Sequence, residues 1–477
     1  MPHYSPRFSA IVAGLLCAVL LSAAWADEFL DMSASMGTTL RLAGITHSPT
    51  TNPDGTGINS WIPAYEGAPA NTAILSNPHM AGADAYGNVY IADKASHSIL
   101  KITTDGLIHT LAGTHVQGFN GDGPALATTL QIDRPNGLFV FPDGTVYLLD
   151  PGNLRIRRVT PDGMMTTIVT NPGTDTGQTP GTGFDWYPSG RALWVSPDQQ
   201  LIYFTNEYAP TPPSIIADGA CVKKWTPAGG IQIICHKALG FRNPGNIAVN
   251  PVDGKLYVTD RAEEEGVPQL EGGLWRIDGP DLRTRMTGNS NAPIAADGQL
   301  ATNSFIEQPR GIAFLPNGAY FLCAHKNGSI WYVDTARVIH RYIKGKGSLD
   351  AYVLPDATHP PLTAQNYINQ PRAVTLAPDG NLLAVCNDSG FVFRVNSVVP
   401  HLPSDLRPAH FGADGLRLNW SGLFGRGYLV QRTPSLVPAS WQTIGTAAGN
   451  AGGVPSEFLD PAATGQTKDF YRLAPAL

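Results

Sequence analysis

The sequence predicts an all-β protein, with a six-bladed β-propeller of four-stranded blades followed by a small β-sandwich-like domain. Two observations lead to this expectation. One motif returns six times along the chain, and a repeat of this length indicates an array of equivalent units. Charged residues make up only 15% of the 477 residues, whereas the chain holds 51 glycines and 40 prolines. That composition is typical of an ordered, turn-rich β protein.

Each repeat contains an apolar run, a glycine turn, a second apolar run that ends in Asp, a short loop and a third apolar run. Residues 78–103 read PHMAGADAYGNVYIADKASHSILKIT, and residues 135–160 read PNGLFVFPDGTVYLLDPGNLRIRRVT. Because these runs alternate or are apolar and are bounded by Gly, Pro, Asn and Asp, they predict strands joined by turns. The first strands of the repeats begin near Pro78, Pro135, Gly190, Pro244, Pro309 and Pro371.

A fourth, outer strand follows the third in five repeats, but the sixth repeat has none before the chain changes composition. Residues 39–44, TLRLAG, are similar to residues 109–113, HTLAG, at the outer strand of the first repeat. We therefore expect residues 38–44 to complete the last blade and close the ring. Closure protects strand edges that would otherwise pair with other chains.

The N-terminus is predicted to be a secretory signal peptide, residues 1–26. Arg7 supplies the positive charge, residues 11–21 form the apolar core, and residues 24–26 read AWA, a small-residue cleavage site. The mature protein is expected to be exported to the periplasm, the cell surface or the extracellular space. No segment is long and apolar enough to predict a transmembrane span.

The remaining boundaries follow from composition. Residues 27–396 are expected to form the propeller, residues 397–408 a proline-containing linker, and residues 409–477 the C-terminal module. Aromatic residues of that module are expected in its core, because aromatic burial stabilises so small a domain: Trp420, Trp441 and Tyr471. The formal net charge of −6 is mild. It excludes a strongly basic protein, so no nucleic-acid partner is expected.

Four cysteines remain after removal of the signal peptide, and an exported protein can keep disulfides. Cys221 and Cys235 flank the turn at residues 226–230, and a hairpin folded about Ala228 places them opposite each other. Directly opposed strand residues are about 4.5–5.5 Å apart, within the reach of a disulfide. We therefore predict a Cys221–Cys235 bridge. For Cys323 and Cys386, a second bridge and two buried thiols remain equally open.

The quoted segments resemble NHL-repeat β-propellers, especially the bacterial exported type with LAG, GFNGDGPA and YIAD motifs. The resemblance covers roughly residues 38–396. It implies six blades of four strands, but it does not imply one chemistry, because this fold hosts binding modules and several enzymes. The C-terminal module is similar to fibronectin type III-like sandwiches. That likeness implies an accessory or attachment role, with a protein or cell-surface partner.

Candidate ligand-binding residues come from one position of the repeat, the residue after the opening proline, here called the ring position. Innermost strands line the channel of a propeller, so this position lies near its mouth. The candidates, with Asn246 one step further along in the fourth repeat, are His79, Asn136, Arg191, Asn246, Arg310 and Arg372. Converging guanidinium groups suit a carboxylate or phosphate, which predicts an anionic small molecule, glycan or peptide as ligand.

The alternative is that each arginine pairs with an Asp of a neighbouring blade, for which Asp93, Asp150 and Asp260 are available. These Asp residues end second strands. A strand-ending Asp more often caps the following loop by accepting hydrogen bonds from backbone N–H groups.

The sequence also offers oxygen ligands for a divalent metal, although it establishes no cofactor. Calcium prefers oxygen donors. The residues that could supply them are Asn136, Asn206, Asn246 and Asp260. Within the resembled family, peptide-amidating lyases hold zinc with three histidines, and gluconolactonase-like propellers use Glu, Asn and Asp. Because His79 is the one histidine at the ring position, calcium is favoured over zinc.

Two function classes follow. The first is a non-catalytic binding protein that holds a peptide, acidic glycan or protein at one face of the channel. The second is an enzyme at the channel mouth: a lyase, a lactonase-like hydrolase or a polysaccharide-degrading enzyme, with or without a divalent metal. The chain has no HExxH, GxSxG or Walker-type motif, so the sequence leaves open whether it is an enzyme.

Overall fold

The computed structural model describes most of the propeller and the strands of the C-terminal module. The described residues are 39–45, 58–170, 191–206, 221–235, 244–261, 272–288, 292–296, 298–325, 328–346, 365–395, 407–412, 414–420, 427–435, 440–448, 456–463 and 470–475. They contain β-strands and short 3-10 helices, and none of their helices is long and apolar enough to cross a membrane. The predicted signal peptide lies outside these residues.

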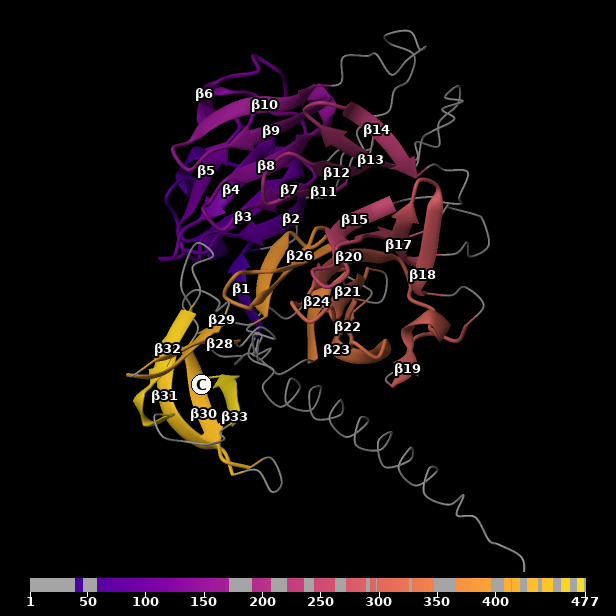
Figure 1. The fold of residues 1–477 in the computed structure, drawn as a ribbon. Coiled ribbons are helices and arrows are strands. Elements are labelled where there is room, and N and C mark those ends of the chain that lie inside the picture. Colours follow the sequence, from indigo (N-terminus) through magenta and orange to yellow (C-terminus); the bar gives the residue numbers. More distant parts are fainter. Residues whose placement is uncertain are drawn as a thin grey trace, which may run out of the picture.

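In the described part of residues 39–395, the strands form six sheets, which we number as blades 1 to 6 (Figure 1). All their strand pairs are antiparallel except one at the outer edge of blade 5. Their innermost strands are β2 (Pro78–Ala83), β7 (Leu138–Val140), β11 (Leu193–Val195), β15 (Pro244–Val249), β20 (Pro309–Phe314) and β25 (Ala373–Leu376). Each innermost strand contacts that of the next blade, and β25 contacts β2. The sheets therefore form a closed ring, as expected for a propeller.

Each innermost strand pairs with a second strand, which pairs with a third. The second strands are β3 (Val89–Asp93), β8 (Val146–Asp150), β12 (Ile202–Asn206), β16 (Leu256–Asp260), β21 (Tyr320–Ala324) and β26 (Leu382–Cys386). The third strands are β4 (Ser98–Ile102), β9 (Arg155–Val159), β13 (Cys221–Thr226), β17 (Gly273–Gly279), β22 (Ser329–Val333) and β27 (Phe391–Val395).

The fourth strands lie at the outside of the ring. They are β5 (Ile108–Ala112), β10 (Met164–Thr170), β14 (Gly230–Cys235), β18 (Leu282–Thr287), β23 (Val338–Lys346) and, for blade 6, β1 (Thr39–Ala43). The predicted closure is confirmed, because β1 pairs antiparallel with β27, with Thr39 opposite Val395. Short additional strands extend two blades: β6 (Ala125–Leu126) on β10, and β19 (Gln299–Leu300) and β24 (Gln365–Asn369) on β23.

Apolar side chains fill the spaces between neighbouring blades. One buried cluster joins blades 6, 1 and 2 and includes Met80, Leu138 and Val385. Further clusters lie between each later pair of neighbouring blades. Second strands such as β3 and β8 are buried along their whole length, which explains why their sequences are almost continuously apolar.

Near the axis, glycine allows neighbouring innermost strands to approach closely. A Cβ on Gly137 would lie 2.8 Å from the Arg191 carbonyl oxygen, and a Cβ on Gly311 would lie 2.5 Å from the Val374 nitrogen. Any side chain here would push the blades apart. These glycines directly follow ring positions, so the tight packing also brings the ring residues together.

Seven short 3-10 helices lie in the described connections. They are η1 (Pro63–Tyr65), η2 (Ala70–Thr72), η3 (Lys94–Ser96), η4 (Ala127–Thr129), η5 (Pro151–Asn153), η7 (Ala301–Asn303) and η8 (Pro461–Ala463). The helices η2, η4 and η7 each precede an innermost strand, in the long connections before blades 1, 2 and 5.

The C-terminal residues form two three-stranded sheets around one apolar cluster. One sheet contains β28 (Arg407–Gly412), β29 (Gly415–Trp420) and β32 (Ser456–Asp460), and the other β30 (Gly427–Thr433), β31 (Gln442–Ala448) and β33 (Phe470–Pro475). Trp420 is 1% exposed within this cluster, and Tyr471 packs against the cluster. Trp441 lies outside this cluster, under the Arg472 guanidinium. The first strand of this module, β28, begins at Arg407, and residues 397–406 of the predicted linker lie outside the described residues.

The predicted Cys221–Cys235 disulfide is wrong. The hairpin forms, with Trp225 opposite Ile231, but a β-bulge between Val222 and Lys223 places Cys235 opposite Val222. The structure gives Cys221 and Cys235 as buried thiols outside any disulfide, and the same holds for Cys323 and Cys386. Burial raises the pKa of the Cys235 thiol to about 11, which makes it unreactive at neutral pH.

Candidate functional site

A pocket of about 320 Å³, including its open mouth, lies where the innermost strands begin. Every blade contributes to its lining, which consists of His79, Asn136, Arg191, Gly245, Asn246, Arg261, Pro309, Arg310 and Arg372. The structure therefore brings together all six residues expected from the ring position. It also adds Arg261, which the sequence analysis missed.

Arg261 could have been found by reading a second equivalent position. It directly follows the strand-ending Asp260 of blade 4. The same position holds Lys94 in blade 1 and His325 in blade 5. These three blades therefore carry a polar side chain at this position, and that of Arg261 lines the pocket.

Side chains from second strands fix the backbone at the ring position. Thr205 Oγ1 donates a hydrogen bond to the Gly245 carbonyl oxygen (2.9 Å), and Thr259 Oγ1 donates one to the Arg310 carbonyl oxygen (2.6 Å). In blade 5, Cys323 Sγ donates to the Pro371 carbonyl oxygen (3.3 Å). All three side chains stand next to last in their strands. Each one bonds to the start of the next blade, so it positions a ring residue across the blade boundary.

The residues before the opening prolines have left-handed backbone. The angle φ is +66° at Asn77, +49° at Gln308 and +44° at Gln370. This conformation is strained for residues other than glycine. It turns the carbonyl groups of Asn77 and Gln370 toward histidines: His79 Nδ1 lies 3.0 Å from the Asn77 oxygen, and His325 Nδ1 lies 2.9 Å from the Gln370 oxygen.

The lining of the pocket holds four arginines and, among the described residues, no Asp or Glu. Arg191, Arg261, Arg310 and Arg372 come from blades 3, 4, 5 and 6. Arg372 forms no ion pair with a described residue. Such an excess of guanidinium groups in a partly buried space favours an anionic ligand.

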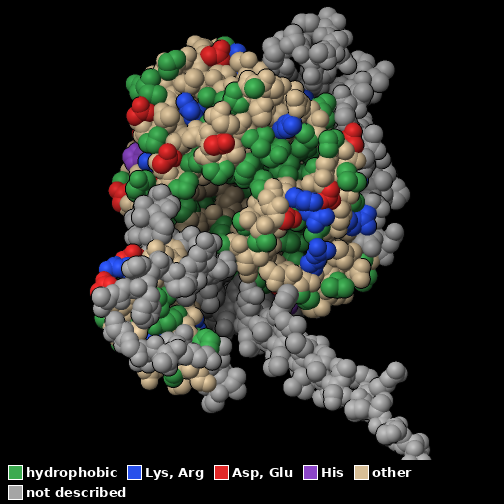
Figure 2. Space-filling view, in the orientation of Figure 1, with side chains coloured by type: hydrophobic (Ala, Val, Ile, Leu, Met, Phe, Trp, Pro, Cys, Tyr) green, Lys and Arg blue, Asp and Glu red, His purple; other side chains and the backbone are tan. Residues whose placement is uncertain are grey.

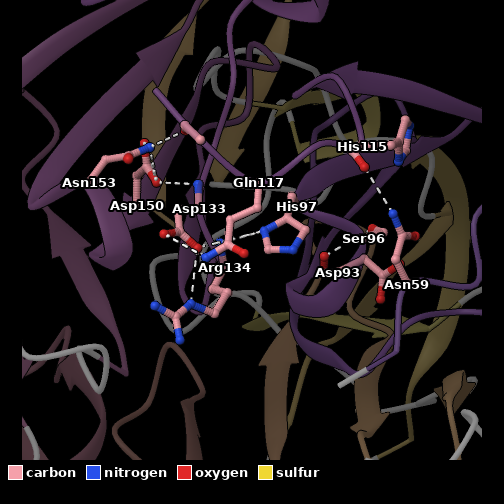
Figure 3. A network of polar contacts seen from close by, with 11 residues as sticks. Asn59, Asp93, Ser96, His97, His115, Gln117, Asp133, Arg134, Asp150 and Asn153 are labelled. Atoms are coloured by element: carbon pink, nitrogen blue, oxygen red, sulfur yellow. Dashed lines mark hydrogen bonds and ion pairs between the residues drawn. The ribbon is translucent and has the colours of Figure 1, made fainter. Parts of the chain in front are cut away.

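The strand-ending Asp residues of blades 1 and 2 cap loops, and Figure 3 shows Asp150 beside its partners Asp133 and Asn153. Asp93 accepts a hydrogen bond from the Ser76 backbone nitrogen (3.0 Å). Asp150 accepts hydrogen bonds from the Asp133 backbone nitrogen (2.7 Å) and from Asn153 Nδ2 (2.9 Å). Burial raises the pKa of both strand-ending carboxyl groups to about 6.

The cation next to Asp150 is Arg157 of its own blade, with Nε 2.9 Å from Oδ2. Asp93 and Asp150 therefore do not form the pairs with ring arginines that the alternative predicts. Their capping role leaves the pocket without neutralising carboxylates from these two blades.

His79 is a neutral histidine at the pocket wall. It is 4% exposed, and burial together with the nearby charges of Lys94 and Arg191 holds its pKa well below the ordinary range. Because Nδ1 lies against a carbonyl oxygen, Nδ1 carries the proton and Nε2 keeps a lone pair. Nε2 makes no hydrogen bond with a described residue.

A second neutral histidine lies near the same arginines. Burial, with the charge of Arg310, lowers the pKa of His325 to about 3. Its Nε2 lies 3.5 Å from Asp388 Oδ2. Desolvation raises the pKa of Asp388, while the charges of Arg310 and Arg191 oppose that rise. Arg310 thus acts on His79, His325 and Asp388 together.

Two asparagines complete the described lining. Asn136 is 2% exposed and Asn246 is 7% exposed. The Asn246 Nδ2 atom is buried and has no hydrogen-bond partner among the described residues. A buried donor without a partner costs about 1–3 kcal/mol. Such a group at a pocket wall favours a ligand atom that accepts its hydrogen bond.

Of the four candidate metal ligands, two lie in the lining of the pocket. Asn136 and Asn246 line the pocket, whereas Asp260 is fully buried at the end of β16 and does not. The side chain of Asn206 lies outside the described residues. Among those residues, no group of three His, Cys, Asp or Glu side chains is placed to hold a metal ion. The four arginines of the pocket lining would repel a cation.

No protein-family model matches the chain. Its structure is similar to that of a protein of unknown function from Bacteroides thetaiotaomicron, with a TM-score of 0.51 and 12% identity over 75% of each chain. An auxiliary nutrient binding protein of the same organism has a TM-score of 0.47 and 11% identity over 75% of each chain. A gluconolactonase from Xanthomonas campestris has a TM-score of 0.42 and 15% identity over 73% of this chain and 97% of its own. Likeness at these identities concerns the β-propeller fold alone.

Proposed function

We propose that this protein is an exported NHL-type propeller that binds an anionic ligand at the channel pocket without changing it. The observation that supports this proposal is the set of four arginines around one pocket whose described lining contains no carboxylate. The ligand is an acidic glycan, a carboxylate-bearing peptide or an acidic segment of a protein. The C-terminal module is proposed to be an attachment domain for a protein or cell-surface partner.

The geometry explains why a carboxylate suits the pocket. Arginine offers paired N–H donors in a plane, and charge-assisted hydrogen bonds to a carboxylate contribute about 1.5–3 kcal/mol each. Arg310 and Arg372 come from adjacent blades, and Cys323 holds the strand start between them through the Pro371 carbonyl group. Because the second strands fix the backbone, little ordering is needed on binding.

The test is a calorimetric titration with a galacturonate trisaccharide. Replacing Arg310→Ala together with Arg372→Ala is expected to weaken binding by about 100-fold or more, because two charged contacts are lost. The melting temperature is expected to change little. A variant that melts far below the parent would mean that these arginines are structural, and the binding role would then be rejected.

Surface arginines provide the matched control. Figure 2 shows Lys and Arg side chains gathered over the region of β17 and β18, with acidic groups among them. Arg276 there lies 2.8 Å from Asp278, and in blade 5 the exposed Arg341 lies over Trp331. Replacing Arg276→Ala together with Arg341→Ala removes the same charge outside the pocket. This control is expected to keep the parent affinity.

A second candidate function is an enzyme at the channel mouth, and His79 is the observation that favours it. A neutral imidazole with an accepting Nε2 beside arginines can take a proton while the guanidinium groups stabilise developing negative charge. That arrangement suits a lyase or a lactonase-like hydrolase. Mass spectrometry of the trisaccharide after incubation separates the two functions. An unchanged ligand supports binding alone, whereas cleavage that is lost in His79→Gln supports the enzyme.

A further inference from the structure

The pocket contains a hydrogen-bond acceptor among its cations, and that combination restricts the ligand. His79 Nε2 keeps a lone pair, because Nδ1–H donates to the Asn77 carbonyl oxygen. The surrounding arginines are donors only. An acceptor at this position cannot bond to a carboxylate, a sulfate or any other group that only accepts. The ligand atom next to His79 must therefore bring a proton of its own.

The lining of the pocket also contains a donor without a partner among the described residues. Asn246 is 7% exposed, and its Nδ2 has no hydrogen-bond partner among the described residues. Thr259 Oγ1 lies 3.2 Å from the Asn246 carbonyl oxygen, so the backbone of this residue is held from β16. The ligand atom next to Asn246 must accept a hydrogen bond. Asn246 and His79 line one pocket, from blades 4 and 1.

A hydroxyl group can meet either requirement, because its oxygen donates one hydrogen bond and accepts others. A water molecule would do the same, but a ligand hydroxyl also displaces that water and gains the direct bonds. The same pocket is lined by four arginines, whose guanidinium groups suit an anionic group nearby. The pocket thus offers separate partners for a hydroxyl and for a carboxylate.

We propose that the ligand is a hydroxylated carboxylic acid, in the form of a uronic acid unit of a glycan. Its carboxylate lies on the arginines, while its hydroxyls donate to His79 Nε2 and accept from Asn246 Nδ2. This inference rests on the proposed anion-binding function and narrows it to a sugar acid. Peptide carboxylates without a neighbouring hydroxyl would leave both groups unpaired, at a cost of about 1–3 kcal/mol each.

The test compares three probes of similar ring size by calorimetric titration: galacturonate, cyclohexanecarboxylate and galactose. Galacturonate carries both groups, cyclohexanecarboxylate only the carboxylate and galactose only hydroxyls. Galacturonate is expected to bind at least about 10-fold more tightly than cyclohexanecarboxylate, because the latter leaves a buried donor and acceptor unpaired. Galactose is expected to bind more weakly than either acid.

Two variants test whether His79 and Asn246 cause the preference for galacturonate over cyclohexanecarboxylate. His79→Phe removes the acceptor, and Asn246→Leu removes the donor. In each variant the affinity for galacturonate is expected to fall toward that for cyclohexanecarboxylate, whose own affinity stays within about 3-fold of the parent value. The comparison of the three probes on the unaltered protein does not depend on how well these variants fold.

The outcomes separate the two proposals. Equal affinity for galacturonate and cyclohexanecarboxylate would overturn the hydroxyl preference and leave anion binding intact. Loss of binding to both acids, with or without binding to galactose, would overturn the anion-binding function itself. A preference for galacturonate that survives in both variants would place the hydroxyl recognition elsewhere and refute the assignment to His79 and Asn246.

Discussion

At the scale of single residues, the buried Asp residues that end the second strands of blades 1 and 2 have different partners. Asp150 and Arg157 are both fully buried, with their side chains at 0% exposure. An ion pair without solvent adds little net stability, because desolvation offsets the attraction, but removal of one partner leaves an uncompensated charge. Asp93, which ends the second strand of blade 1, has no such arginine and accepts a hydrogen bond from the Ser76 backbone nitrogen instead.

Breaking this pair is expected to be costly. We predict that Asp150→Asn lowers the free energy of unfolding by about 3–5 kcal/mol, because Arg157 remains charged and buried. The double variant Asp150→Asn/Arg157→Met is expected to recover part of that loss. Urea denaturation measures both. Asp143, which is exposed in a turn, is the control, and Asp143→Asn is expected to cost less than about 1 kcal/mol. Equal losses at both sites would contradict the buried-charge argument.

At the scale of elements, three alanines connect neighbouring blades at the rim. Ala127, which begins η4, accepts a hydrogen bond from the Gly113 nitrogen of blade 1 and donates one to the Gly163 oxygen of blade 2. Ala70 bonds to Gly44 and Gly106 in the same way. The third example, Ala301, bonds to Gly288 and Arg337. We call each arrangement a rim clasp.

The glycine that donates its N–H to the alanine of a rim clasp cannot be replaced without backbone movement, whereas the glycine that accepts from that alanine has more space. Gly113 has φ of +96°, and a Cβ there would lie 2.3 Å from the His97 carbonyl oxygen. Gly106 has φ of +84°, but a Cβ there would have no atom within 4 Å. Gly106→Ala is therefore expected to cost about 1–2 kcal/mol for the left-handed backbone alone.

Gly113→Ala is expected to cost at least 2 kcal/mol more, about the effect of overpacking added to the same backbone term. Denaturant unfolding of the two variants provides the measurement. Similar losses for Gly113→Ala and Gly106→Ala would mean that the rim clasp adjusts freely. A larger loss at Gly113 would show that blades 1 and 2 are held at a fixed distance there.

The elements also explain which predictions from the sequence succeed. Strands and the closing strand follow from apolar patterning, which is a property of single segments. The pairing register depends on two strands together, so the pattern of one segment does not determine it. The bulge that separates Cys221 from Cys235 recurs at the same end of the outer strand pairs in other blades, for example between Ile99 and Leu100 and between Leu274 and Trp275. No residue type in these sequences marks the bulge, so a hairpin counted from its turn loses the register after it.

At the scale of the whole molecule, the site exists because the ring is closed. All six blades contribute to the pocket, so equivalent positions of the repeat predicted its members. Arg261 stands at a second equivalent position of the repeat, directly after a strand-ending Asp. The repeat could not predict the neutral state of His79 or the Asn246 donor that has no partner among the described residues, because both depend on contacts between blades. Binding and ring closure are thus properties of the same assembly of strands, and β1 closes that assembly.

Removal of β1 is therefore expected to affect both properties. A chain beginning at Thr39 keeps every pairing of β1 with β27, and it is expected to melt and to bind galacturonate like the chain from residue 27. A chain beginning at Ile45 leaves the edge of β27 unpaired. Because exposed edges pair with other chains, this protein is expected to associate and to melt at a lower temperature.

The affinity of the chain from residue 45 for galacturonate is also expected to fall, because blades 6 and 1, which the closed ring joins, contribute Arg372 and His79 to the pocket. Size-exclusion chromatography, thermal melting and calorimetric titration of the two chains provide the comparison, and they differ only in residues 39–44. If the chain from residue 45 is a monomer with the melting temperature and affinity of the parent, the contacts between innermost strands hold the ring without its outer closing strand. Loss of binding without association would instead assign β1 to the alignment of blades 6 and 1 at the pocket.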